Sequence, residues 1–185
     1  MASTLQGCPR MDLDRLLTRC RGFEARAAAT YRAYAARTRS RPEVCAIWTA
    51  LARDEDAHEH TLARAASWLE KTNGWHTSLG GWDEALDEID ERLIEAERPD
   101  IGADVDRMLL AAIALERTEI DTLFHRLLGV LQVEGGLADA HAHLEQLLAM
   151  ADASTNAGVK FEAALLRAHR VLIARPTNAP PERGS

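Results

Sequence analysis

Apolar residues recur every three or four positions along most of the chain, which is the spacing of residues on one face of an α-helix. The first stripe begins at Leu13 and Leu17, the second at Val44, and later ones at Val105 and Leu137. Together with turn and capping residues, the stripes predict helices over roughly 11–38, 42–71, 103–132 and 136–153, a shorter acidic helix over 82–97 and a final helical stretch over 159–174. The sequence therefore predicts an all-α protein.

The predicted helices are joined by connections of very different length. Ser40 and Glu43 form a capping box around Pro42, so the first two helices are separated by a short turn. A glycine-containing turn at 134–136 separates the third and fourth, whereas residues 72–102 form a long connection. We expect one helical domain over residues 11–174, with a flexible tail at 1–10 and a disordered, proline-rich tail at 175–185.

Composition and charge narrow the class of protein. The chain has a net charge of −7 with no basic patch, which argues against nucleic-acid binding and favours a cation as partner. The cysteines Cys8, Cys20 and Cys45 form no CxxC pair, so neither a disulfide framework nor a cysteine zinc site is expected. The N-terminus has no apolar signal segment, and the longest apolar run, 108–115, is too short to cross a membrane. These features predict a cytoplasmic protein with no membrane partner.

Charged residues interrupt the apolar stripes near the middle of three predicted helices. Glu24 lies on the first stripe, Glu55 and His58 lie on the second, and Glu116 and Glu119 lie on the third. Burying a carboxylate without compensation costs several kcal/mol, so four together require protons, partners or a metal ion. These five residues are therefore the candidate metal ligands.

Distance along each helix supports their convergence. Glu24 and Glu55 each lie about 15 residues from the first turn, and Glu119 lies about 15 residues before the turn at 134–136, so at ~1.5 Å per residue they reach one layer. Oxygen donors with one imidazole favour iron or manganese over zinc or copper. The alternative is that the carboxylates lie at the boundary of the core and form salt bridges to nearby arginines, for which the candidates are Arg21, Arg26, Arg53 and Arg117.

This pattern resembles the ferritin-like superfamily and, within it, the rubrerythrin type. Such proteins carry Glu on the first helix, Glu-x-x-His on the second, Glu-x-x-Glu on the third and a second Glu-x-x-His on the fourth. The resemblance spans residues from about 12 to 150. It implies a ferritin-like antiparallel four-helix bundle, with a long crossover between helices two and three and a C-terminal helical extension. It also implies that the metal ligands are Glu24, Glu55, His58, Glu116 and Glu119.

The fourth predicted helix departs from the family pattern. Alignment with the second helix puts His141 and Leu144 where Glu and His are expected. Counting residues from the turn instead puts the ligand layer near 150–152, where Asp152 is the only nearby donor, with Glu162 and His169 further along. His141 is either a ligand or a boundary residue, so the second metal position stays open. The absence of CxxC pairs also implies that the rubredoxin module of many rubrerythrins is missing.

The resulting hypothesis is an iron-binding redox protein that acts on peroxide or dioxygen. Two irons, or one, would be held with Glu55 and a glutamate of the third helix as bridges and with Glu24 and His58 as terminal ligands. Tyr31, and Tyr34 beside it, serve either as electron donors or as packing. A metal-free or degenerate bundle acting as a scaffold, and an iron-storage cage, are the alternatives. A homo-oligomer, such as a dimer, is expected.

Overall fold

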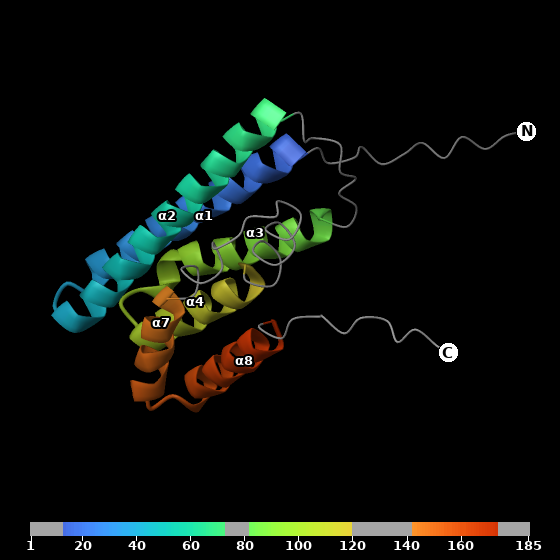
Figure 1. Ribbon diagram of the computed structural model, residues 1–185. Coiled ribbons are helices and arrows are strands. Elements are labelled where there is room, and N and C mark those ends of the chain that lie inside the picture. Colours follow the sequence, from blue (N-terminus) through green and yellow to red (C-terminus); the bar gives the residue numbers. More distant parts are fainter. Residues whose placement is uncertain (1–12, 73–81, 120–141, 174–185) are drawn as a thin grey trace, which may run out of the picture.

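The structure is a computed structural model that describes residues 13–72, 82–119 and 142–173, with side chains over 14–67, 82–118 and 144–168. All regular elements in these ranges are helical, which confirms the prediction of an all-α protein. The elements are α1 (Leu13–Arg37), α2 (Pro42–Thr72), α3 (Asp83–Glu97), the 3-10 turn η1 (Pro99–Ile101), α4 (Val105–Glu119), α7 (Ala142–Ala153) and α8 (Ala157–Ile173) (Figure 1).

Where the structure describes the ends of helices, several of them coincide with turn and capping residues in the sequence. The first helix ends at a turn in which the backbone N–H of Arg41 donates to the carbonyl of Thr38 (2.8 Å), and α2 begins at Pro42 as predicted. Asn156 caps α8, because its Oδ1 accepts the N–H of Gly158 at 2.9 Å. The third and fourth predicted helices are observed only as α4 and α7, and the predicted turn at 134–136 lies outside the described residues.

The pair formed by α1 and α2 is the longest packed unit of the described structure. The two helices run antiparallel side by side (Figure 1), and their shared face buries Leu17, Tyr31 and Trp48. Tyr31 stacks on Trp48 with ring centroids 5.9 Å apart, and Tyr34 meets the edge of Trp48 at 5.2 Å. These aromatic contacts fix the register of the pair near its turn.

Contacts between α3 and α1 show that α3 belongs to the core. Arg19 pairs with Asp87 (3.0 Å) near the start of both helices, and the Tyr34 hydroxyl donates to the carbonyl of Ala96 (2.7 Å) near the end of both. The two helices are therefore parallel. Since α3 reverses direction through η1 into α4, the latter runs in the same direction as α2 (Figure 1).

The C-terminal helices pack on α4. The hydroxyl of Ser154 donates to Asp106 Oδ1 (2.7 Å), so the C-terminal end of α7 lies beside the start of α4. In α8, Glu162 forms a 2.8 Å ion pair with Arg117 of α4, and Leu166 is fully buried. None of the described helices is long and apolar enough to span a membrane.

Two isoleucines of α3 provide a test of whether this helix packs into the core. Ile89 is fully buried, whereas Ile94, five residues later, is 55% exposed. We expect Ile89→Ala to lower the free energy of unfolding by about 2–5 kcal/mol because it leaves a cavity. Ile94→Ala makes the same change in helix propensity and should stay within about 0.5 kcal/mol of the parent. Urea unfolding of both variants measures the difference, and equal stability would show that α3 is not part of the core.

Candidate metal centre

Three helices place carboxylates in the interior of the protein, at the positions that the apolar helix faces predicted. Glu24 of α1 and Glu55 of α2 are fully buried, and Glu116 of α4 is 2% exposed. Each of these glutamates lies on the apolar face of its helix, because it is three or four residues away from the next buried residues on that helix. Three of the five candidate ligands therefore occupy positions at which a carboxylate is costly without a partner.

His58 connects the carboxylates of α1 and α2. Its Nδ1 lies 3.0 Å from Glu55 Oε2 and 3.5 Å from Glu24 Oε2. One ligand atom from each of these three residues lies within 4.8 Å of the other two. Ligands bound to one ion by bonds of about 2.1 Å are separated by at most about 4.2 Å, so small side-chain movements would suffice for all three to share a cation. The donor set fits a metal ion.

Glu116 adjoins this group from α4. The hydroxyl of Tyr31 donates a buried 2.7 Å hydrogen bond to Glu116 Oε1, and the charge of Glu116 acts on Glu55. Glu119 is the last residue of α4, and its side chain lies outside the described residues. The structure thus brings together Glu24, Glu55 and His58, with Glu116 close to them.

The electrostatics of the group favour a cation. Burial raises the pKa of Glu55 well above its usual value, and the charges of Glu116 and Glu24 raise it further. The hydrogen bond and charge of His58 oppose this rise of the pKa. A positive ion at this position would relieve the repulsion between the carboxylates and replace part of their lost hydration.

Most of the arginines considered as alternative partners are bound to other carboxylates. Arg21 pairs with Glu59 at 2.7 Å, and Arg26 of α1 pairs with Asp90 and Glu97 of α3. Arg117 pairs with Glu162 of α8, as described above.

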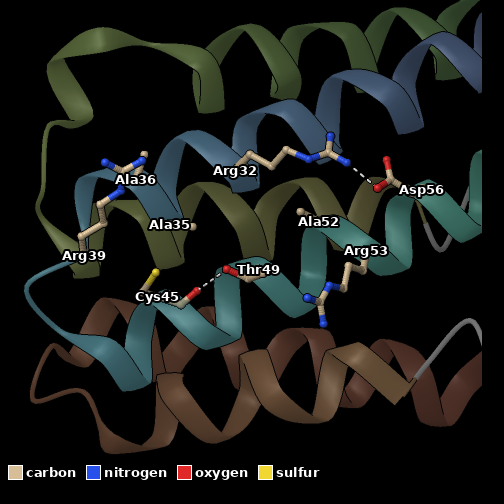
Figure 2. Close-up of a pocket in the computed structure, with 9 residues that line it drawn as sticks. All are labelled: Arg32, Ala35, Ala36, Arg39, Cys45, Thr49, Ala52, Arg53 and Asp56. Carbon is tan, nitrogen blue, oxygen red and sulfur yellow. Dashed lines mark hydrogen bonds and ion pairs between the residues drawn. The ribbon is translucent and has the colours of Figure 1, made fainter.

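The fourth arginine, Arg53, lines an open groove of about 480 Å³ on the α1–α2 pair, shown in Figure 2. The groove also contains Arg39, Cys45 and the ion pair of Arg32 with Asp56. Glu24, Glu55 and His58 are not among its lining residues. The groove is therefore separate from the candidate metal centre.

Asp152, the donor that residue counting gave on the fourth predicted helix, does not lie in the core. Asp152 is 59% exposed and forms a 2.6 Å ion pair with Arg167. Because Ser154 contacts Asp106, Asp152 lies near the start of α4, roughly 15 Å along that helix from Glu116. Near the start of α7, Leu144 is fully buried.

The sequence alignment placed Leu144 at the position of the family's histidine, so an apolar residue stands at that position. The described core-facing residues of α7 are apolar: Leu144, Leu147, Leu148 and Ala151. The position of His141, like that of His125, lies outside the described residues. Among the described residues of α7, the buried side chains therefore include no metal donor.

The hydrogen bond from Tyr31 to Glu116 was not anticipated. The position of Tyr31, two turns after Glu24 on the same face, predicts either an electron donor or a packing residue. The structure shows that Tyr31 both packs, on Trp48, and orients a candidate ligand. Only its spacing from Glu24 hinted at this second contribution.

Comparison with known proteins gives no further guidance, because no family model, curated protein or solved structure matches the chain. The resemblance to the ferritin-like superfamily therefore depends on the residues and contacts described above.

The raised pKa of Glu55 predicts how the stability of metal-free protein depends on pH. Below the pKa that Glu55 has in the unfolded chain, the carboxyl is protonated in both the folded and the unfolded protein, and its contribution to stability is complete. This contribution is lost as the pH rises through the higher pKa that Glu55 has in the folded protein. The free energy of unfolding in chelator should therefore increase as the pH is lowered from neutral, by up to about 1.4 kcal/mol per pH unit for one proton. Urea unfolding at three pH values measures this slope.

Glu55→Gln is the control for this prediction, because its amide cannot titrate. The variant should show a shallower rise of stability on acidification than the parent. Identical slopes for the two proteins would mean that Glu55 is ionised in the core without strain.

Proposed function

We propose that the protein is a ferritin-like iron protein in which Glu24, Glu55, His58 and Glu116 hold the metal, with Glu119 completing the set. The observation that carries the proposal is the convergence of Glu24, Glu55 and His58 within 4.8 Å in a buried position. Such a group is costly in an apolar core unless a cation or protons compensate it.

The directions of the helices support a four-helix bundle with a long crossover. The antiparallel pair of α1 and α2 would be followed by a connection that contains α3, and α4 would then run parallel to α2. The fourth bundle helix would include α7, whose C-terminal end lies beside the start of α4. In this arrangement α8 is the C-terminal extension. One long crossover connection of this kind is a property of ferritin-like folds.

The donor set supports iron as the ion, with manganese as the second choice. Carboxylate oxygens and an imidazole nitrogen suit these metals, and the described residues place no thiolate beside them. Glu55 is the natural bridge, because it contacts His58 and is influenced by both Glu24 and Glu116. Whether one iron or two are bound depends on donors from the fourth helix, where the described residues offer only apolar side chains.

Bound iron would supply the electron exchange with peroxide or dioxygen. The chain's own contribution is to orient the ligands and to exclude water. Tyr31 holds Glu116 by a hydrogen bond, and His58 holds Glu55. Buried Trp48 and the surrounding leucines keep the site dry, which strengthens each electrostatic interaction in it. We further propose a cytoplasmic homo-oligomer, as expected from the sequence.

A second candidate function is a metal-free bundle that serves as a scaffold. The apolar core face of α7 favours this alternative, since a complete family site would need a Glu-x-x-His on that helix. In such a protein some of the carboxyl groups would be protonated, and the hydrogen bonds of Tyr31 and His58 would stabilise the others.

Thermal melts of the parent and Glu55→Gln, with chelator and with anaerobic Fe²⁺, distinguish the two functions. Fe²⁺ should stabilise the parent by about 2.7 kcal/mol at a hundredfold excess over its dissociation constant. Glu55→Gln should be at least as stable as the parent in chelator, because it removes repulsion, yet it should not respond to Fe²⁺.

Glu59→Gln is the matched control, since Glu59 lies one turn further along α2 and pairs with Arg21 at the surface. This variant should keep the full response to Fe²⁺. If parent and Glu55→Gln melt alike in both conditions, the iron proposal fails and the scaffold function replaces it.

A further inference from the structure

Thr30 differs from the other buried and half-buried threonines in the described helices. The hydroxyls of Thr38 and Thr49 donate to the carbonyl four residues earlier, each at 2.8 Å, and that of Thr118 does so at 3.0 Å. Thr30 is only 5% exposed, and its Oγ1 has no hydrogen-bond partner among the described residues. A buried hydroxyl without a partner is uncommon, and here it requires an explanation.

The Thr30 side chain lines a pocket between α1 and the last turn of α3. The pocket has a volume of about 190 Å³ and is also lined by Tyr34 and Arg37 of α1. The Nη1 atom of Arg37 is buried and likewise has no partner among the described residues. Two hydrogen-bond donors that have no acceptor in the described part of the chain therefore line one small pocket.

The other polar groups of the pocket are already engaged. Arg26 binds both carboxylate oxygens of Glu97, at 2.8 and 2.9 Å, and also contacts Asp90. The hydroxyl of Tyr34 donates to the carbonyl of Ala96. The guanidinium of Arg37 is thus the cation that remains for a ligand.

The remaining walls are small and apolar. They come from the methyl groups of Ala29, Ala33 and Ala96. The volume of about 190 Å³ is far above the ~10–15 Å³ that one water occupies and below the range of roughly 300–1,000 Å³ typical of larger ligands. A ligand of a few heavy atoms fits, with one polar end and one apolar end.

We propose that this pocket binds a small monocarboxylate with a short alkyl chain. One carboxylate oxygen would accept from the Nη1 of Arg37 and the other from the hydroxyl of Thr30, while the alkyl chain contacts the alanine methyl groups. A guanidinium and a hydroxyl are donors that suit a carboxylate with two oxygens. The proposal is independent of the iron site, because Glu24, Glu55 and His58 do not line the pocket.

Sodium propionate is the probe, with sodium chloride and sodium phosphate at equal ionic strength as competing anions. Isothermal titration of the full chain with propionate should show saturable one-site binding, and propionate should raise the Tm. Thr30→Val keeps the shape of the side chain but removes its hydroxyl, and it should weaken propionate binding by roughly tenfold or more. Arg37→Gln should weaken it at least as much.

Thr49→Val is the matched control, because Thr49 donates to a carbonyl and lies outside this pocket. Without propionate, Thr49→Val should lower the Tm, whereas Thr30→Val should leave it unchanged or raise it, since a buried hydroxyl without a partner is removed. Thr49→Val should bind propionate as the parent does.

Three results would overturn the proposal. The first is the absence of saturable binding, or equal binding of chloride or phosphate, which would exclude a carboxylate site. The second is unchanged propionate affinity in Thr30→Val. The third is a clear loss of Tm in ligand-free Thr30→Val, which would show that the hydroxyl has a structural partner.

Discussion

The burial of Glu24, Glu55 and Glu116 inside one helical core is the constraint on which the rest of the structure depends. Each carboxylate loses its hydration there, and the pKa of Glu55 is raised by this burial and further by the charges of Glu116 and Glu24. The protein supplies partial compensation through His58, which contacts Glu24 and Glu55, and through Tyr31, which donates to Glu116. Such a core is stable only if protons or a cation complete this compensation.

Large side chains hold this group in place. Tyr31 reaches from α1 to Glu116 of α4, and Trp48 of α2 packs against its ring at 5.9 Å. Tyr34, whose ring lies beside that of Tyr31, donates a hydrogen bond to the carbonyl of Ala96 at the end of α3. The aromatic stack therefore connects the register of three helices to the position of the carboxylates. The same arrangement leaves the pocket of Thr30 and Arg37 between α1 and α3.

Much of this could be predicted from the sequence, because helix faces follow from periodicity alone. The spacing of Glu24, Glu55 and His58 on their stripes, and their equal distance from a short turn, were enough to predict their convergence. The exposure of Asp152 was not predictable, because it depends on how α7 packs against α4 and α8, through Ser154 with Asp106 and through Asp152 with Arg167. Residue counts along one helix contain no information about such lateral contacts.

The most direct test of the central claim is a crystal structure of the protein loaded with Fe²⁺ without oxygen, measured at the iron absorption edge. If iron binds at the buried centre, an anomalous peak should lie about 2.0–2.2 Å from carboxylate oxygens of Glu24 and Glu55 and from Nδ1 of His58. Iron found only on exposed carboxylates such as Asp152, with Glu24 and Glu55 buried and metal-free, would contradict it.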